Sequence, residues 1–134
     1  MEKTKKRFIC IGLMSLSLFL FSVSVSAYSG SFTFDIHTTV IGETKHVLAS
    51  AQTSSTSSGE TYAGGTISPT KYNYNVDITE NVIFGKEYSS AALTANGLRR
   101  TDQYGTIAGS KYAVRVRSQG PNSHRLVGSG SINQ

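Results

Sequence analysis

Cysteine is almost absent from this chain of 134 residues, and Cys10 is the only one. It lies inside an apolar run from Phe8 to about Phe21. The sequence after that run can form no disulfide framework, no thiolate nucleophile and no cysteine-ligated metal site. We therefore expect that part of the chain to fold by packing alone.

A second long apolar run is also missing, because none follows residue 27. Cations precede the single run, at Lys3, Lys5, Lys6 and Arg7, and small residues follow it up to Ala27. This order is typical of a secretory signal peptide, and the run is shorter than the roughly 20 apolar residues of a membrane-spanning helix. We therefore predict that residues 1–27 are a signal peptide, that residues 28–134 are secreted and extracellular, and that this mature part has no transmembrane anchor.

Sequence patterns of catalysis and nucleotide binding are missing too. There is no Gly-x-Ser-x-Gly elbow, and residues 105–109 lack the Lys-Ser/Thr ending of a phosphate loop. Glu80 and Glu87 fall near predicted strand ends, where solvated acids are common. We expect a binding protein rather than an enzyme, with no cofactor and no intracellular nucleic acid as its partner.

The sequence does contain a clear hydrophobic period of two. Apolar and polar residues alternate over residues 32–40, 71–79 and 112–117, and these segments are rich in Val, Ile, Thr, Tyr and Phe. Such alternation is the mark of half-buried strands. With turn-like breaks between the runs, it predicts an all-β fold, a single-domain antiparallel β-sandwich or small barrel over residues 28–134.

The turn signals predict how some of these strands connect. Gly42-Glu43 can close a hairpin in which Ile36 faces Ala49, and Asn96-Gly97 is the strongest hairpin signal in the chain. The Ser/Thr/Gly-rich segment from Ala51 to Gly65 is predicted to be a mobile loop or a weak strand.

The first predicted hairpin carries a candidate metal site. Its register places His37 and His46 on one outer face as diagonal neighbours, with Asp35 two residues from His37. Two imidazoles and a carboxylate could ligate Zn²⁺ or Cu²⁺. The alternative is a solvated polar sheet face, because a slip of one residue would separate the ligands.

Charge is unevenly distributed along the mature part. Without the predicted signal peptide, nine Lys and Arg residues face seven Asp and Glu residues, and residues 94–134 alone carry a net charge of +5. Six basic residues of this region are candidate anion-binding residues: Arg99, Arg100, Lys111, Arg115, Arg117 and Arg125. Lys111, Arg115 and Arg117 share one parity, so they should project from one face. The alternative is an ordinary charged surface that protects a sheet edge from aggregation.

These features predict a secreted, non-enzymatic binding protein, bacterial by its Lys-rich N-terminus. We expect it to contact an anionic envelope polymer, a lipid surface or an extracellular matrix component through its C-terminal basic face. Two alternatives remain open: a secreted antagonistic or membrane-active (bacteriocin-like) protein, and a matrix component that self-assembles through an open sheet edge.

Overall fold

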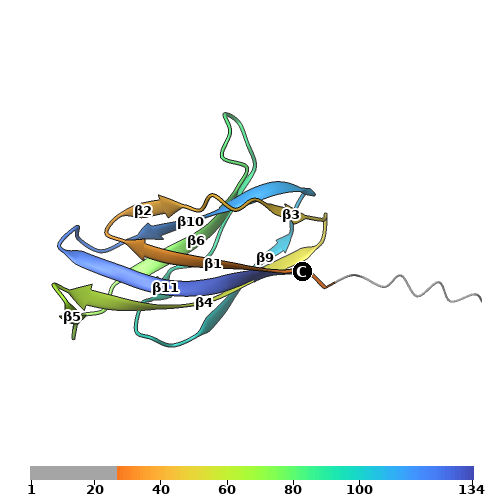
Figure 1. The fold of residues 1–134 in the computed structure, drawn as a ribbon. Helices are drawn as coiled ribbons and strands as arrows, with labels where there is room; N and C mark the ends of the chain where they lie inside the picture. Colours follow the sequence, from red (N-terminus) through yellow and green to blue (C-terminus); the bar gives the residue numbers. More distant parts are fainter. Residues whose placement is uncertain (1–26) are drawn as a thin grey trace, which may run out of the picture.

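Residues 27–134 form two antiparallel sheets in the computed structural model, which describes this part of the chain (Figure 1). Sheet A contains β1 (Ser29–Ile36), β4 (Gln52–Ala63), β5 (Thr66–Ile67), β9 (Arg100–Thr106) and β11 (His124–Asn133). Sheet B contains β2 (Thr39–Ile41), β3 (His46–Leu48), β6 (Asn73–Thr79), β7 (Glu87–Ser89), β8 (Leu93–Thr94) and β10 (Ser110–Ser118). Apart from residue 27, the predicted signal peptide lies outside the described residues.

The two sheets have separate strand orders. Sheet A runs β1-β11-β4, and β4 pairs on with both β9 and β5. Sheet B runs β2-β10-β6-β7, with β3 also paired to β10 and β8 also paired to β6. The sheets pack against each other without closing into a barrel, which confirms the predicted single-domain antiparallel β-sandwich and excludes its barrel alternative.

The core is built from the alternating apolar positions of both sheets. Val76 of β6 and Val116 of β10 are at most 1% exposed, and Phe34 of β1 in sheet A belongs to the same core cluster. The rings of Phe34 and Tyr74 pack across the sandwich with their centroids 5.2 Å apart. The predicted period of two is therefore the pattern that buries this core.

Two glycines of β11 make room for aromatic rings of the neighbouring strand. Phe34 pairs with Gly128, and Phe32 pairs with Gly130, across the β1–β11 ladder. A Cβ atom on Gly128 would lie 2.4 Å from Phe34 Cζ, and one on Gly130 would lie 2.6 Å from Phe32 Cζ. The rings therefore cover bare glycine backbone, a pairing that pins the register of these two strands.

The segment from Ala51 to Gly65 contains β4, a continuous strand of 12 residues rather than a mobile loop. Its inward polar side chains are small, and tyrosines from other strands form hydrogen bonds with two of them. Ser57 Oγ lies 2.9 Å from the Tyr74 hydroxyl, and the Tyr104 hydroxyl lies 2.9 Å from Ser55 Oγ. Burial raises the pKa of Tyr74 and Tyr104, so both phenols stay neutral in these bonds.

The predicted hairpin at Gly42-Glu43 is wrong. β1 pairs with β11 in sheet A, whereas the chain after β1 crosses to sheet B and runs from β2 to β3 along β10. Gly42 N donates to Val114 O at 2.8 Å, so the segment stays bonded to β10 where the hairpin would turn. A dipeptide that can form a turn does not by itself decide which strands pair. The pairing and its register depend on how the apolar side of each strand is buried.

The Asn96-Gly97 turn is formed, with Gly97 at a φ of 79°, but it does not close a hairpin. β8, which precedes it, pairs with β6 in sheet B, and β9, which follows it, pairs with β4 in sheet A. Gly97 N donates to Gly59 O at 2.7 Å. The turn therefore carries the chain from one sheet to the other.

Candidate binding surfaces

Arg115 and Arg117, two of the six predicted anion-binding residues, already hold a carboxylate of this chain. The Asp77 carboxylate is fully buried and lies beside β10 on β6. It accepts a hydrogen bond from Arg115 Nε at 3.0 Å, and two from Arg117, through Nε at 2.6 Å and Nη2 at 3.1 Å. Arg115 also forms an ion pair with Glu87 of β7. We call these four residues the Asp77 cluster.

The charges of the Asp77 cluster balance. Burial alone would raise the pKa of Asp77, but hydrogen bonds from Arg117, Ser89 and Arg115 outweigh it and hold that pKa below its usual range. Asp77 is therefore ionised at neutral pH and depends on both guanidinium groups. The predicted common face of Lys111, Arg115 and Arg117 is formed, but two of its three cations serve this internal carboxylate.

Arg125 has an internal partner as well. It pairs with Asp35 across the β1–β11 ladder at the surface of sheet A. The Arg125 guanidinium holds the pKa of Asp35 below its usual range. Because both side chains are exposed, this pair adds little to stability and can exchange partners readily.

Arg99, Arg100 and Lys111 form no ion pair with any residue between 27 and 134. Arg100 is the first residue of β9 and pairs with Ser57 of β4, and the exposed Arg99 directly precedes this strand of sheet A. Lys111 lies on β10 in sheet B, next to Val47 of β3. The six basic residues therefore do not form one patch, because they are divided between the two sheets.

The three predicted metal ligands lie in different surroundings. His46 is buried, with the Tyr28 hydroxyl 2.7 Å from its Nδ1, and desolvation lowers its pKa. His37 is exposed, with its Nδ1 3.0 Å from the backbone oxygens of Asn122 and His124 at the start of β11, whereas Asp35 is paired with Arg125. The hairpin that would bring them together is absent, and residues 27–134 contain no group of three His, Cys, Asp or Glu side chains arranged to hold a metal.

The outer face of sheet A is lined by hydroxyl and amide side chains. They come from alternate positions of four adjacent strands, and each residue is exposed or half-buried. We call this surface the hydroxyl face; its residues are Ser29, Ser31, Thr33, Gln52, Ser54, Thr56, Ser58, Thr101, Gln103, Thr106, Ser129, Ser131 and Asn133.

The strand register arranges the hydroxyl face in rows. One row crosses four strands, from Ser31 on β1 through Ser131 and Thr56 to Thr101 on β9. Adjacent strands are about 4.8 Å apart, and residues on one side of a strand repeat at about 6.7 Å. Hydroxyl groups therefore recur on a regular grid, and some already bond to each other, as Thr56 Oγ1 does to Thr101 Oγ1 at 2.9 Å.

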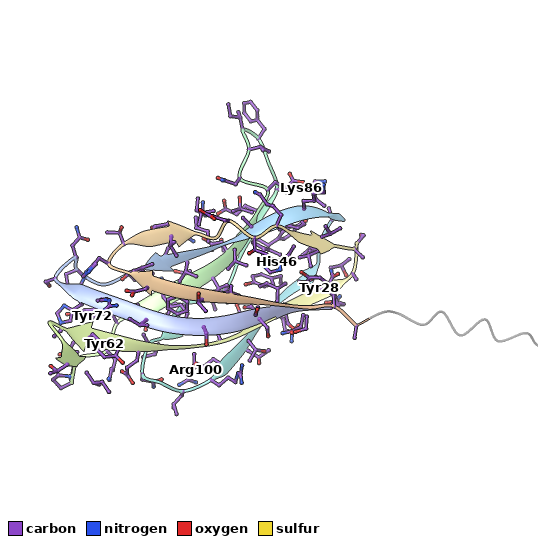
Figure 2. All side chains as sticks on the ribbon, viewed as in Figure 1. Tyr28, His46, Tyr62, Tyr72, Lys86 and Arg100 are labelled. Carbon is purple, nitrogen blue, oxygen red and sulfur yellow. The ribbon has the colours of Figure 1, made fainter. Side chains whose placement is uncertain are left out.

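A second distinct surface is the loop between β6 and β7, which projects from the sandwich (Figure 1). Three consecutive apolar side chains form its tip: Val82 is 65% exposed, Ile83 is 87% exposed and Phe84 is 102% exposed. Lys86 lies at the base of the loop (Figure 2). We call residues 82–84 the apolar tip.

Sequence reasoning missed both surfaces, although each leaves a signal. The hydroxyl face was hidden because a Ser/Thr-rich segment resembles a loop in composition. The apolar tip is an apolar triplet enclosed by Asn81 and Gly85, two residues typical of turns. Turns are normally polar, so an apolar triplet between two turn residues indicates an exposed apolar loop.

The fold and these surfaces define a two-sheet antiparallel β-sandwich with two outward-facing candidate binding surfaces. No family model, curated protein or solved structure matches the chain. Residues 27–134 contain no helix that is long and apolar enough to cross a membrane.

Proposed function

We propose that this chain is an exported, non-enzymatic binding protein that holds a hydroxyl-rich, anionic polymer of the bacterial envelope or extracellular matrix against the hydroxyl face. The observation that carries this proposal is the register of outward Ser and Thr residues, which is continuous from β1 through β11 to β4 and extends to β9 with one β-bulge at Thr53/Ser54. A flat, regular surface of this kind fits an extended, repeating ligand better than a small molecule, which needs a concave site.

The chemistry of the face supports such a ligand. Each Ser or Thr hydroxyl is a donor and an acceptor at once, so the grid can bond to polyol or sugar hydroxyl groups in either direction. Each contact exchanges bonds with water and adds little, so useful affinity requires many contacts along one polymer.

The charged residues at the rim of the face support an anionic polymer. Arg99 is exposed, directly precedes β9 at the edge of sheet A, and has no acidic partner among the described residues. Arg125 lies on β11 of the same sheet and pairs only with the exposed Asp35. Guanidinium groups bind phosphate or carboxylate in a bidentate manner, so these two residues are favoured over Arg115 and Arg117, which already bind Asp77.

The test is co-sedimentation of residues 28–134 with isolated cell walls, and with walls stripped of anionic polymer, over a salt series. The test variant is Ser129→Glu with Thr101→Glu, which adds two negative charges to the hydroxyl face at exposed sites. The matched control is Thr39→Glu with Val47→Glu, two exposed sites on the edge strands of sheet B.

We expect the unmodified protein to bind intact walls, to bind stripped walls more weakly, and to dissociate as salt rises. The hydroxyl-face variant should bind at least about tenfold more weakly than the control variant, since like charges repel and the grid is interrupted. Equal binding by the two variants would show that the polymer does not use this face.

A further inference from the structure

The apolar tip is part of an ordered turn. Gly85 N donates to Val82 O at 2.9 Å, and Asn81 N donates to Thr79 Oγ1 at 3.0 Å. At the base of the loop, Glu80 N donates to Lys86 O at 3.0 Å, and Lys86 N donates to the Glu80 side chain at 2.7 Å. These bonds fix the shape of the loop, so its apolar side chains are presented in a defined arrangement.

The backbone of the loop is strained in a way that serves this presentation. Asn81 has a φ of 52° and Phe84 a φ of 58°, both in the left-handed region. Asn tolerates that region, whereas a bulky residue such as Phe rarely adopts it. Phe84 therefore holds an unfavourable conformation while its ring makes no contact that hides it from water. Residues with strained backbone conformations are often found at functional sites, including ligand-binding sites.

The tip is also unusual among the exposed apolar residues of the described chain. The other four, Ile41, Val47, Ile67 and Leu98, are well separated in sequence, whereas the tip exposes three in succession. Single exposed apolar residues are ordinary, but a contiguous apolar group marks an interaction site. The tip is convex and projects from the sandwich (Figure 1), so it can insert into a membrane or into a groove of another molecule, but it cannot act as a pocket for a ligand.

We propose that the apolar tip inserts into the surface of a lipid bilayer with anionic headgroups. A bilayer accepts a convex apolar wedge without a complementary groove, and bulky apolar residues at an interface bury their side chains among the acyl chains. Basic residues flank the wedge: Lys86 in the loop (Figure 2), and Lys111, two residues from the Ala113–Thr79 pair that precedes the loop. At headgroup depth these cations favour an anionic surface. This membrane contact is separate from the polymer contact proposed for the hydroxyl face.

The chain contains no tryptophan, so a single one introduced at the tip reports on that position alone. The test uses residues 28–134, which contain both sheets, with Phe84→Trp. The matched control is Ile67→Trp on β5, another exposed apolar site, 59% exposed and outside the loop. Each protein is mixed with phosphatidylglycerol/phosphatidylcholine vesicles, with pure phosphatidylcholine vesicles, and with vesicles brominated on the acyl chains.

We expect Phe84→Trp to show a blue-shifted emission and quenching by brominated lipid, most strongly with anionic vesicles, while Ile67→Trp stays unchanged. Ile83→Asp, at a side chain that is 87% exposed, should lower vesicle binding at least about tenfold and leave thermal unfolding unchanged, because burying a charge opposes insertion. A water-exposed emission from Phe84→Trp at vesicle excess would overturn the proposal. A blue shift that depends on protein concentration and not on vesicles would also overturn it, and would show that the tip docks on a second copy.

Discussion

The Asp77 cluster allows a sharp test of how this sandwich is stabilised. The change is Arg115→Met with Arg117→Met, which keeps the aliphatic stems over sheet B but removes both guanidinium groups from a carboxylate that is fully buried. Breaking a buried pair by removing one side typically costs about 3–5 kcal/mol, because the remaining charge is left without a partner. With a urea slope of about 2 kcal/mol/M, the unfolding midpoint should fall by about 2 M.

The pH dependence of this loss has a definite sign. In the unmodified protein the pKa of Asp77 is held below its unfolded value of about 3.9, so its stabilisation is present above that pH and disappears as the pH falls through the folded pKa. In the double variant the hydrogen bonds from both arginines are lost, and burial, which raises that pKa, is opposed only by the hydrogen bond from Ser89. The variant should therefore be most stable when Asp77 is protonated, and should lose stability as the pH rises from about 4 to 7.

The assay is urea unfolding of both proteins at pH 4 and pH 7, followed by circular dichroism. The difference in unfolding free energy should be larger at pH 7 than at pH 4. Arg125→Met is the control, because its pair with Asp35 is exposed to solvent and should contribute little to stability. A difference below 1 kcal/mol for the double variant, or one that is the same at both pH values, would refute the assigned role of the Asp77 cluster.

Three further predictions concern the interior. His46→Phe should weaken the loss of stability between pH 7 and pH 5, because burial lowers the pKa of His46 and the folded state resists its protonation; urea midpoints at both pH values measure this. Gly128→Ala should cost about 3 kcal/mol, because its Cβ would lie 2.2 Å from a backbone oxygen of β4, whereas Gly65→Ala, in open space, should change the melting temperature little. Tyr104→Phe should cost about 1 kcal/mol in urea unfolding, because it removes the hydroxyl that bonds to Ser55 Oγ and Val76 O; an unchanged midpoint would contradict that.

The sequence predicted those strands whose burial is carried by apolar side chains. β6 and β10 follow the expected alternation, because each has one side against the core. β4 lacks this apolar alternation, because its inward side chains are those of Ser and Thr. Its stability as a strand depends on hydroxyl partners from Tyr74 and Tyr104, which lie 17 and 49 residues away in sequence. A local pattern contains no information about such partners.

The same limit applies to the predicted basic face. Alternation placed Lys111, Arg115 and Arg117 on one side of β10, as the ladder has them. The alternation gives no information about the acidic partners of these cations. Asp77 lies 38 residues from Arg115, and Asp35 lies 90 residues from Arg125. Whether a cation is free for a ligand is a property of tertiary neighbours, so counting charges along the chain overstated the charge available to an external anion.

The two proposed contacts lie on different parts of the sandwich, and this decides how they can be tested. The hydroxyl face belongs to sheet A, whereas the apolar tip extends from sheet B, on the side away from β4 and β9 in Figure 1. A polymer on one surface therefore need not displace a bilayer from the other. Two weak contacts on one rigid body reinforce each other when both targets lie on the same envelope, since the second contact forms at a high effective concentration. Ile83→Asp should consequently leave wall binding intact and Ser129→Glu should leave vesicle binding intact, so that loss of one contact leaves the other measurable.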